Sequence, residues 1–235
     1  MPLTPLSKQH FGSCSKQFTA ACILKLNIDL NADIHRYLPK LPPFTHNGER
    51  VTVTVQHLLN MRSGLPEVLV YGFLRGIPDE EMTIDQKLAP LYNQTEIPLA
   101  FKPDKQELYC NTNYYLLAKI AEEASKQPLR DFAQQHIFGP QEMNDTGFVD
   151  QSRSPQEKQV IPGYEGNEQH STKNTTWGAC GVVGTPEDMV LWDNQIPPTL
   201  LDLSCSIFLT RYALMRYRIA CGGRIEKISV RRKRN

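Results

Sequence analysis

The segment Phe11-Gly-Ser-Cys-Ser-Lys-Gln-Phe-Thr-Ala20 joins a candidate nucleophile to the start of a predicted helix. Ser13 is a favourable residue for a helix start, and apolar residues recur over 12–26 with helical spacing. Lys16 follows three residues later and therefore lies on the same face of the helix. A serine there benefits from the helix dipole, and a desolvated lysine loses its proton readily. The pair favours nucleophilic catalysis. The alternative is a solvent-exposed Ser and Lys on an ordinary helix, which would show the same sequence pattern.

A second polar motif, Tyr109-Cys-Asn111, opens a strongly amphipathic helix predicted over 111–126. A phenol at Tyr109 could relay a proton between Ser13 and a leaving group, and the amide of Asn111 could hold a substrate carbonyl. A core tyrosine and a helix-capping asparagine are the alternative interpretation. Further helices are predicted, in chain order, at 34–38, 53–61 with Thr54 as cap, 82–89, 129–138 and 185–192.

Composition excludes several classes of protein. The chain has 235 residues, 40% hydrophobic and 22% charged, with a formal net charge of +1. These values allow one domain or two small ones and do not fit global disorder or a nucleic-acid-binding surface. The longest apolar stretch, 200–209, is too short for a membrane span, and residues 1–10 lack the apolar core of a signal peptide. We therefore expect no membrane association. The compartment stays open, with a cytoplasmic location as the favoured interpretation.

The cysteines and histidines do not form a metal-binding pattern. The six cysteines contain no C-x-x-C pair, which favours free thiols in a reducing compartment, and neither they nor the six histidines have ligand spacing. Cys14 and Cys110 occupy the variable positions of the two motifs, where core packing is the favoured role. We expect structural roles for His57 and His136.

Six segments in order resemble the serine β-lactamase and penicillin-binding-protein superfamily. The likeness is to the branch of class C β-lactamases, carboxypeptidases, esterases and D-aminopeptidases, and it covers about residues 8–195. After the S-x-x-K segment come 34–39, 53–66, 108–117, 136–148 and 178–188; the last is similar to the pattern "G-x-G-G-L-x-S-T-x-x-D".

This resemblance implies a fold and a mechanism. The fold would be α+β, with a helical region on an incomplete antiparallel sheet and the active site between them. Ser13 would attack an amide or ester carbonyl to form an acyl-enzyme, with Lys16 as general base and Tyr109 as proton relay. Asn111 would bind the substrate. The resemblance implies a small-molecule or short peptide substrate, such as a D-amino-acid peptide, a β-lactam or an ester, and no cofactor. The segment 163–166 is similar to D-aminopeptidases in particular.

The sequence departs from the family pattern towards both ends. About a dozen residues precede Ser13, where relatives carry some tens. The third family motif, H-x-G or K-x-G, has its nearest match at 220–226, where Cys221 replaces the cation and Gly223 matches the glycine. Cys221 and Gly223 are the remaining candidate substrate-binding residues, although this segment could be an ordinary turn.

These departures divide the chain into a partial β-lactamase-related domain at 1–195 and a degenerate remainder at 196–235. The remainder ends in a basic tail, for which a solvated end is favoured over a nucleic-acid-binding patch. The expectation is a truncated or rearranged relative with poor activity, since losing one oxyanion-hole donor alone lowers the rate by about 10²–10³-fold. Two alternatives stay open: a catalytically dead binding or scaffold protein of the same fold, and a chain that does not fold alone. The oligomeric state is left open.

Overall fold

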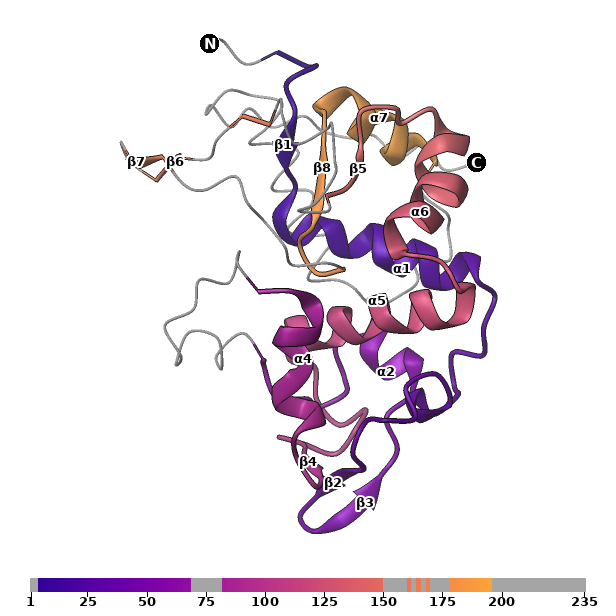
Figure 1. The fold of residues 1–235 in the computed structure, drawn as a ribbon, viewed down its shortest axis with the longest axis vertical. Helices are drawn as coiled ribbons and strands as arrows, with labels where there is room; N and C mark the ends of the chain where they lie inside the picture. Colours follow the sequence, from indigo (N-terminus) through magenta and orange to yellow (C-terminus); the bar gives the residue numbers. More distant parts are fainter. Residues whose placement is uncertain are drawn as a thin grey trace, which may run out of the picture.

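The computed structural model describes residues 4–68, 82–149, 160–161, 164–165, 168–169 and 178–195. Its helical elements, in chain order, are η1 (Gly12–Ser15), α1 (Lys16–Lys25), η2 (Ile34–Arg36), α2 (Val55–Leu59), α4 (Ile84–Tyr92), α5 (Asn111–Ser125), α6 (Leu129–Ala133), η4 (Gln134–Phe138), η5 (Gly139–Gln141) and α7 (Pro186–Gln195). Its strands are β1 (Gln9–His10), β2 (Phe44–His46), β3 (Glu49–Val51), β4 (Ile97–Pro98), β5 (Gly147–Phe148), β6 (Tyr164–Glu165), β7 (Glu168–Gln169) and β8 (Val182–Gly184). Helices and small sheets together form the predicted α+β fold (Figure 1).

The sheet that adjoins the candidate site has the strand order β1-β8-β5. Both of its pairings are antiparallel, and Val183 of β8 faces His10 on one side and Gly147 on the other. All three residues of β8 are buried. A Cβ added at Gly184 would lie 2.9 Å from the ring of Phe11, so the strand needs a glycine there. The predicted antiparallel sheet is correct for this part of the fold.

A second three-stranded sheet, in the order β3-β2-β4, lies at the opposite end of the molecule (Figure 1). Phe44 of β2 pairs antiparallel with Val51 of β3 but parallel with Ile97 of β4. The sequence patterns did not predict this second, mixed sheet. Strand β4 comes after α2 and α4, and a connection of this length lets two paired strands run in the same direction.

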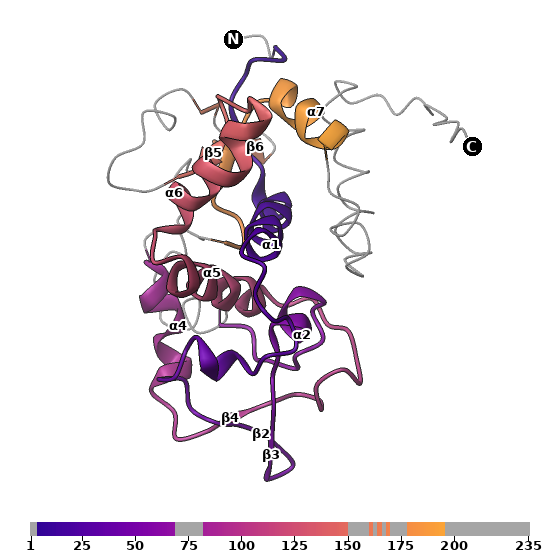
Figure 2. The same ribbon diagram turned by 90° about the vertical axis from the view of Figure 1, so that its right-hand side faces the viewer.

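Helix α1 crosses the middle of the molecule, beside α5 and below the β1-β8-β5 sheet (Figures 1 and 2). The helical pattern predicted one apolar stripe, yet Lys16, Thr19 and Ile23 are buried as well as Phe18. Thr19 is accommodated because its hydroxyl donates a 2.8 Å hydrogen bond to the Gly178 carbonyl. A polar group that is hydrogen-bonded loses much less free energy on burial than an unpaired one. Lys16, Phe18 and Thr19 of the first turn of α1 are therefore all buried.

Helix α2 begins with a reciprocal cap. The Thr54 hydroxyl accepts from the His57 N–H at 3.2 Å, and His57 Nδ1 accepts from the Thr54 N–H at 3.1 Å. This is a capping box with histidine in place of the usual Glu or Gln. Burial lowers the pKa of His57, which favours the neutral ring that this acceptor role needs. The expected structural role of His57 is confirmed.

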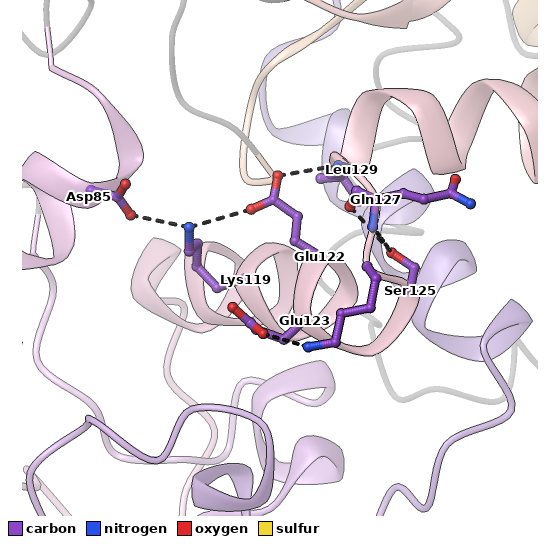
Figure 3. A network of polar contacts seen from close by, with 8 residues as sticks. Asp85, Lys119, Glu122, Glu123, Ser125, Gln127 and Leu129 are labelled. Carbon is purple, nitrogen blue, oxygen red and sulfur yellow. Dashed lines mark hydrogen bonds and ion pairs between the residues drawn. The ribbon is translucent and has the colours of Figure 1, made fainter.

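Helix α5 is anchored to α4 and α6 by the polar network of Figure 3. Lys119 of α5 forms ion pairs with Asp85 of α4 at 3.2 Å and with Glu122 at 3.4 Å. Glu122 also accepts the backbone N–H of Leu129, the first residue of α6. Exposed ion pairs are individually weak, but Glu122 here contacts both Lys119 and the start of α6. The network thereby links α5 to both neighbouring helices.

The helix predicted at 129–138 is not one regular α-helix. Helix α6 ends at Ala133, and a π-helical turn continues to Phe138 before the short η5. The wider turn lets both Ile137 and Phe138 reach the core. Gly139 follows where a Cβ would approach the Gln134 carbonyl oxygen to 2.8 Å. His136 packs its ring against Phe132 at this helix end, as expected for a structural residue.

Candidate active site

Ser13 lies in the 3₁₀ turn η1, which leads directly into α1. Val182 of β8 is hydrogen-bonded to both ends of this turn. The Phe11 N–H donates to the Val182 carbonyl, and the Val182 N–H donates to the buried Ser15 hydroxyl, both at 2.9 Å. Gly12 has a φ of +52°, a left-handed conformation that glycine adopts at little cost. The backbone at Ser13 is thus fixed to the sheet, while its side chain stays partly exposed.

Lys16 is fully buried and points its amine at the Ser13 hydroxyl. Its Nζ donates hydrogen bonds to Ser13 Oγ at 3.2 Å, to Tyr109 OH at 2.8 Å and to the Ala179 carbonyl oxygen at 2.9 Å. These three contacts match the three donors of an ammonium group. Burying a lysine costs free energy unless its N–H donors are hydrogen-bonded. The fold therefore has to supply acceptors around Lys16. The predicted neighbourhood of Ser13 and Lys16 is present.

Tyr109 completes a triangle with these two side chains. Its hydroxyl lies 2.6 Å from Ser13 Oγ and 2.8 Å from Lys16 Nζ. It also donates to Asn111 Oδ1 at 3.3 Å. A network of this kind offers a continuous path for a proton between serine, lysine and tyrosine. Four of the six residues singled out from the sequence therefore meet at one place.

Glu67 orients Asn111 and was missed by the sequence reasoning. Its Oε2 accepts the Asn111 backbone N–H at 2.7 Å and the Asn111 side-chain Nδ2–H at 3.0 Å. A carboxylate at the start of α5 is favourable because the N-terminal N–H groups of a helix are partly positive. The only sequence signal was an acidic residue directly after the 53–66 segment. Its contact with Asn111 spans 44 positions and depends on the fold.

Cys180 is the second residue at the site that the sequence reasoning missed. Its Sγ lies 3.6 Å from Ser13 Oγ, within hydrogen-bonding distance for sulfur. The family pattern aligned to 178–188 has glycine at this position, so the substitution is a visible signal in the sequence. Cys110 is buried and donates to the carbonyls of Leu65 and Pro66, which confirms core packing for that thiol. Cys14 is partly exposed but also packs against the core, as expected.

Cys221 and Gly223 lie outside the described residues, so their assignment to substrate binding stays a prediction. In the ranges that the structure describes, no group of three or more His, Cys, Asp or Glu side chains is arranged to hold a metal ion.

A Ser-Lys-Tyr cluster between a helical region and an antiparallel sheet is the arrangement implied by the resemblance to serine β-lactamases and penicillin-binding proteins. The Beta-lactamase family matches residues 1–206, and the chain belongs to this family. The family assignment made from the sequence is therefore confirmed.

Two curated relatives illustrate the similarity. Penicillin-binding protein 4* of Bacillus subtilis is 32% identical over 159 residues, which are 66% of this chain and 34% of that protein. A D-aminopeptidase of Gluconobacter oxydans is 27% identical over 207 residues, or 85% of this chain and 38% of that protein. The chain thus spans well under half the length of these relatives.

A solved structure supports the fold. The D-amino acid amidase of Ochrobactrum anthropi SV3 superimposes with a TM-score of 0.67 at 27% identity, covering 83% of this chain and 57% of the amidase. The penicillin-binding protein homologue of Pyrococcus abyssi has a TM-score of 0.62 at 26% identity, with 82% and 45% covered. The predicted β-lactamase-like fold is confirmed.

Proposed function

We propose that this chain carries the catalytic centre of a serine hydrolase that cleaves amide or ester bonds through an acyl-enzyme. The observation that carries the proposal is the contact of one partly exposed hydroxyl, Ser13 Oγ, with both a buried amine and a phenol. Serine is a weak nucleophile until a neighbouring base takes its proton, and Lys16 is placed to do so. Tyr109 shares contacts with both groups and supplies the second proton-transfer step.

The hydrogen bonds of Lys16 limit how the proton can move. The Ala179 carbonyl oxygen can only accept, so one N–H of Lys16 is always directed to it. When Lys16 is neutral, its lone pair can accept from one of the two hydroxyls beside it, Ser13 or Tyr109. Ser13 then attacks the carbonyl carbon, and its proton passes to Lys16 directly or through Tyr109. Tyr109 returns a proton to the leaving group, and water later releases the acid from Ser13.

Amides of D-amino acids are the proposed substrate class. Two of the relatives above are named D-aminopeptidase and D-amino acid amidase. The carboxylate of Glu67, beside Asn111, adds a negative charge to the edge of the site, which complements the ammonium group of an unblocked amino acid. Asn111, which lies beside Tyr109, is the proposed contact for the amide of the same substrate.

A substrate panel tests this proposal. We expect the purified chain to release p-nitroaniline from D-alanine p-nitroanilide faster than from the L-isomer or the N-acetylated D-isomer. Ser13→Ala sets the background. A folded chain that hydrolyses no member of a panel of D-amino-acid anilides, nitrocefin and p-nitrophenyl acetate would support the dead binding-protein alternative and contradict the proposal.

Glu67→Gln should reduce the preference of the enzyme for substrates with a free amino group over N-acetylated substrates. Removing one charge near the substrate ammonium costs about 1–2 kcal/mol, so the ratio of rates for the free and N-acetylated D-alanine anilides should fall by about tenfold. The amide of glutamine can still accept from Asn111, so the rate on the acetylated substrate should change less. Glu123→Gln, an exposed carboxylate on α5, is the matched control. An unchanged ratio would remove Glu67 from substrate recognition.

The remaining expectations on organisation and partners stay proposals. The division at residue 195 and the degenerate remainder at 196–235 fall largely outside the described residues. The partner we propose is a small-molecule or short peptide substrate. The Pyrococcus abyssi homologue is described as octameric, which is a property of that protein. Among the helices that the structure describes, none has the length and apolar character needed to cross a membrane.

A further inference from the structure

Two thiols flank the candidate nucleophile. Cys180 Sγ is 3.6 Å from Ser13 Oγ, and Cys14 is the next residue after Ser13. Both cysteines pack against the hydrophobic core beside the site. Neither forms a disulfide, and both are partly exposed. The proposed mechanism uses neither of them.

We propose that Cys180 is a thiol-modification site that takes a small disulfide, such as oxidised glutathione, and that the resulting adduct blocks Ser13. The backbone on either side of Cys180 is held in place: the Ala179 carbonyl accepts from Lys16, and the Gly181 carbonyl accepts from the Val149 N–H at 2.8 Å. These contacts keep the backbone of residue 180 beside the nucleophile.

The exchange is balanced in atoms and electrons. The Cys180 thiol gives up its proton, and its sulfur attacks one sulfur of glutathione disulfide. A new S–S bond forms to Cys180 as the S–S bond of the reagent breaks, and the leaving glutathione thiolate takes up a proton. The reagent is the oxidant, and a reducing thiol reverses the step. A glutathionyl group attached 3.6 Å from Ser13 Oγ fills the space in which a substrate carbonyl must approach.

Burial makes the other described thiols poor competitors. Cys22 is fully buried in α1, and Cys110 is 3% exposed. Burial raises the pKa of the Cys14 thiol to about 11, against the opposing effect of Lys16. A thiol that keeps its proton at neutral pH exchanges slowly, because the thiolate is the attacking form. Among the described cysteines, Cys180 is thus favoured over Cys22 and Cys110 by its partial exposure, and over Cys14 by its contact with Ser13.

The test treats the purified chain with oxidised glutathione at neutral pH and maps the adduct by peptide mass spectrometry. Among the four cysteines that the structure describes, we expect the glutathionyl group on Cys180, with Cys22 and Cys110 unmodified. Labelling of Ser13 by a fluorophosphonate probe should slow by about tenfold or more, because only the unmodified fraction keeps an accessible nucleophile. Dithiothreitol should restore it. In Cys180→Ala, whatever labelling of Ser13 remains should not change when oxidised glutathione is added. In Cys14→Ser, labelling of Ser13 should still slow, and the adduct should still map to Cys180.

Two results would overturn this inference: an adduct absent from Cys180 while buried thiols react, or equal inhibition of Cys180→Ala and the parent chain. The inhibition rests on the proposed function, but the adduct does not. If the untreated chain is never labelled at Ser13, the proposed function fails, and the mass map still decides whether Cys180 is the reactive thiol.

Discussion

Lys16→Met is expected to slow acylation of Ser13 by about 10²–10⁴-fold, the usual contribution of a positioned general base. Methionine fills much of the volume of the buried side chain but can neither accept the Ser13 proton nor donate to Tyr109 and the Ala179 carbonyl. The rate of fluorophosphonate labelling measures the effect directly, and a thermal melt by circular dichroism establishes that the variant is folded.

Lys25→Met is the matched control for this prediction. Lys25 is on the same helix but is exposed at its last turn, so the same substitution should leave the labelling rate within about twofold, as for most surface changes. A folded Lys16→Met variant that is labelled as fast as Lys25→Met would contradict the role of Lys16 as the base.

Gly178→Ala is expected to destabilise the fold by about 2–4 kcal/mol, from backbone strain together with overpacking. Gly178 has a φ of +79°, and a Cβ there would lie 2.5 Å from the Tyr114 carbonyl oxygen and 2.7 Å from Ala118 Cβ. The first of these is backbone of α5 and cannot move cheaply. Because the next residue supplies the carbonyl that holds Lys16, labelling of Ser13 should fall as well. Chemical denaturation measures the stability change.

Gly48→Ala separates the two causes. Gly48 has nearly the same φ, +80°, but no heavy atom would lie within 4 Å of its added Cβ. Gly48→Ala should therefore lower the free energy of unfolding only by the cost of backbone strain, about 1–2 kcal/mol. Equal losses at Gly48 and Gly178 would mean that the close approach of α5 to residue 178 does not limit the structure.

The four residues that meet at the site could be predicted from the sequence only because several family motifs occur together in the right order. S-x-x-K by itself predicted one helix face, and nothing in its spacing placed Tyr109 beside Ser13, 96 positions away. Once the motifs were recognised together, the α+β fold and the neighbourhood of Ser13, Lys16, Tyr109 and Asn111 followed.

The other contacts of the site could not be predicted, because they join segments that are far apart in the sequence and meet only in the folded chain. The carbonyl of Ala179 carries no side-chain signal, and Glu67 reaches Asn111 only after the loop before α5 has folded back. The apolar stripe of α1 did not indicate that Lys16 and Thr19 would also be buried, since their burial requires carbonyl partners from the turn that precedes β8. The parallel pairing of β2 with β4 likewise depends on tertiary contacts between distant segments.

The central claim is that Ser13 is a nucleophile activated by its contacts with Lys16 and Tyr109. The most direct measurement is peptide mass spectrometry of the chain after reaction with a fluorophosphonate probe. The account predicts one stoichiometric adduct on Ser13, abolished in Ser13→Ala and unchanged in Ser7→Ala, a serine well outside the cluster. A folded chain that carries no adduct on Ser13, or carries it on another serine, would contradict the account.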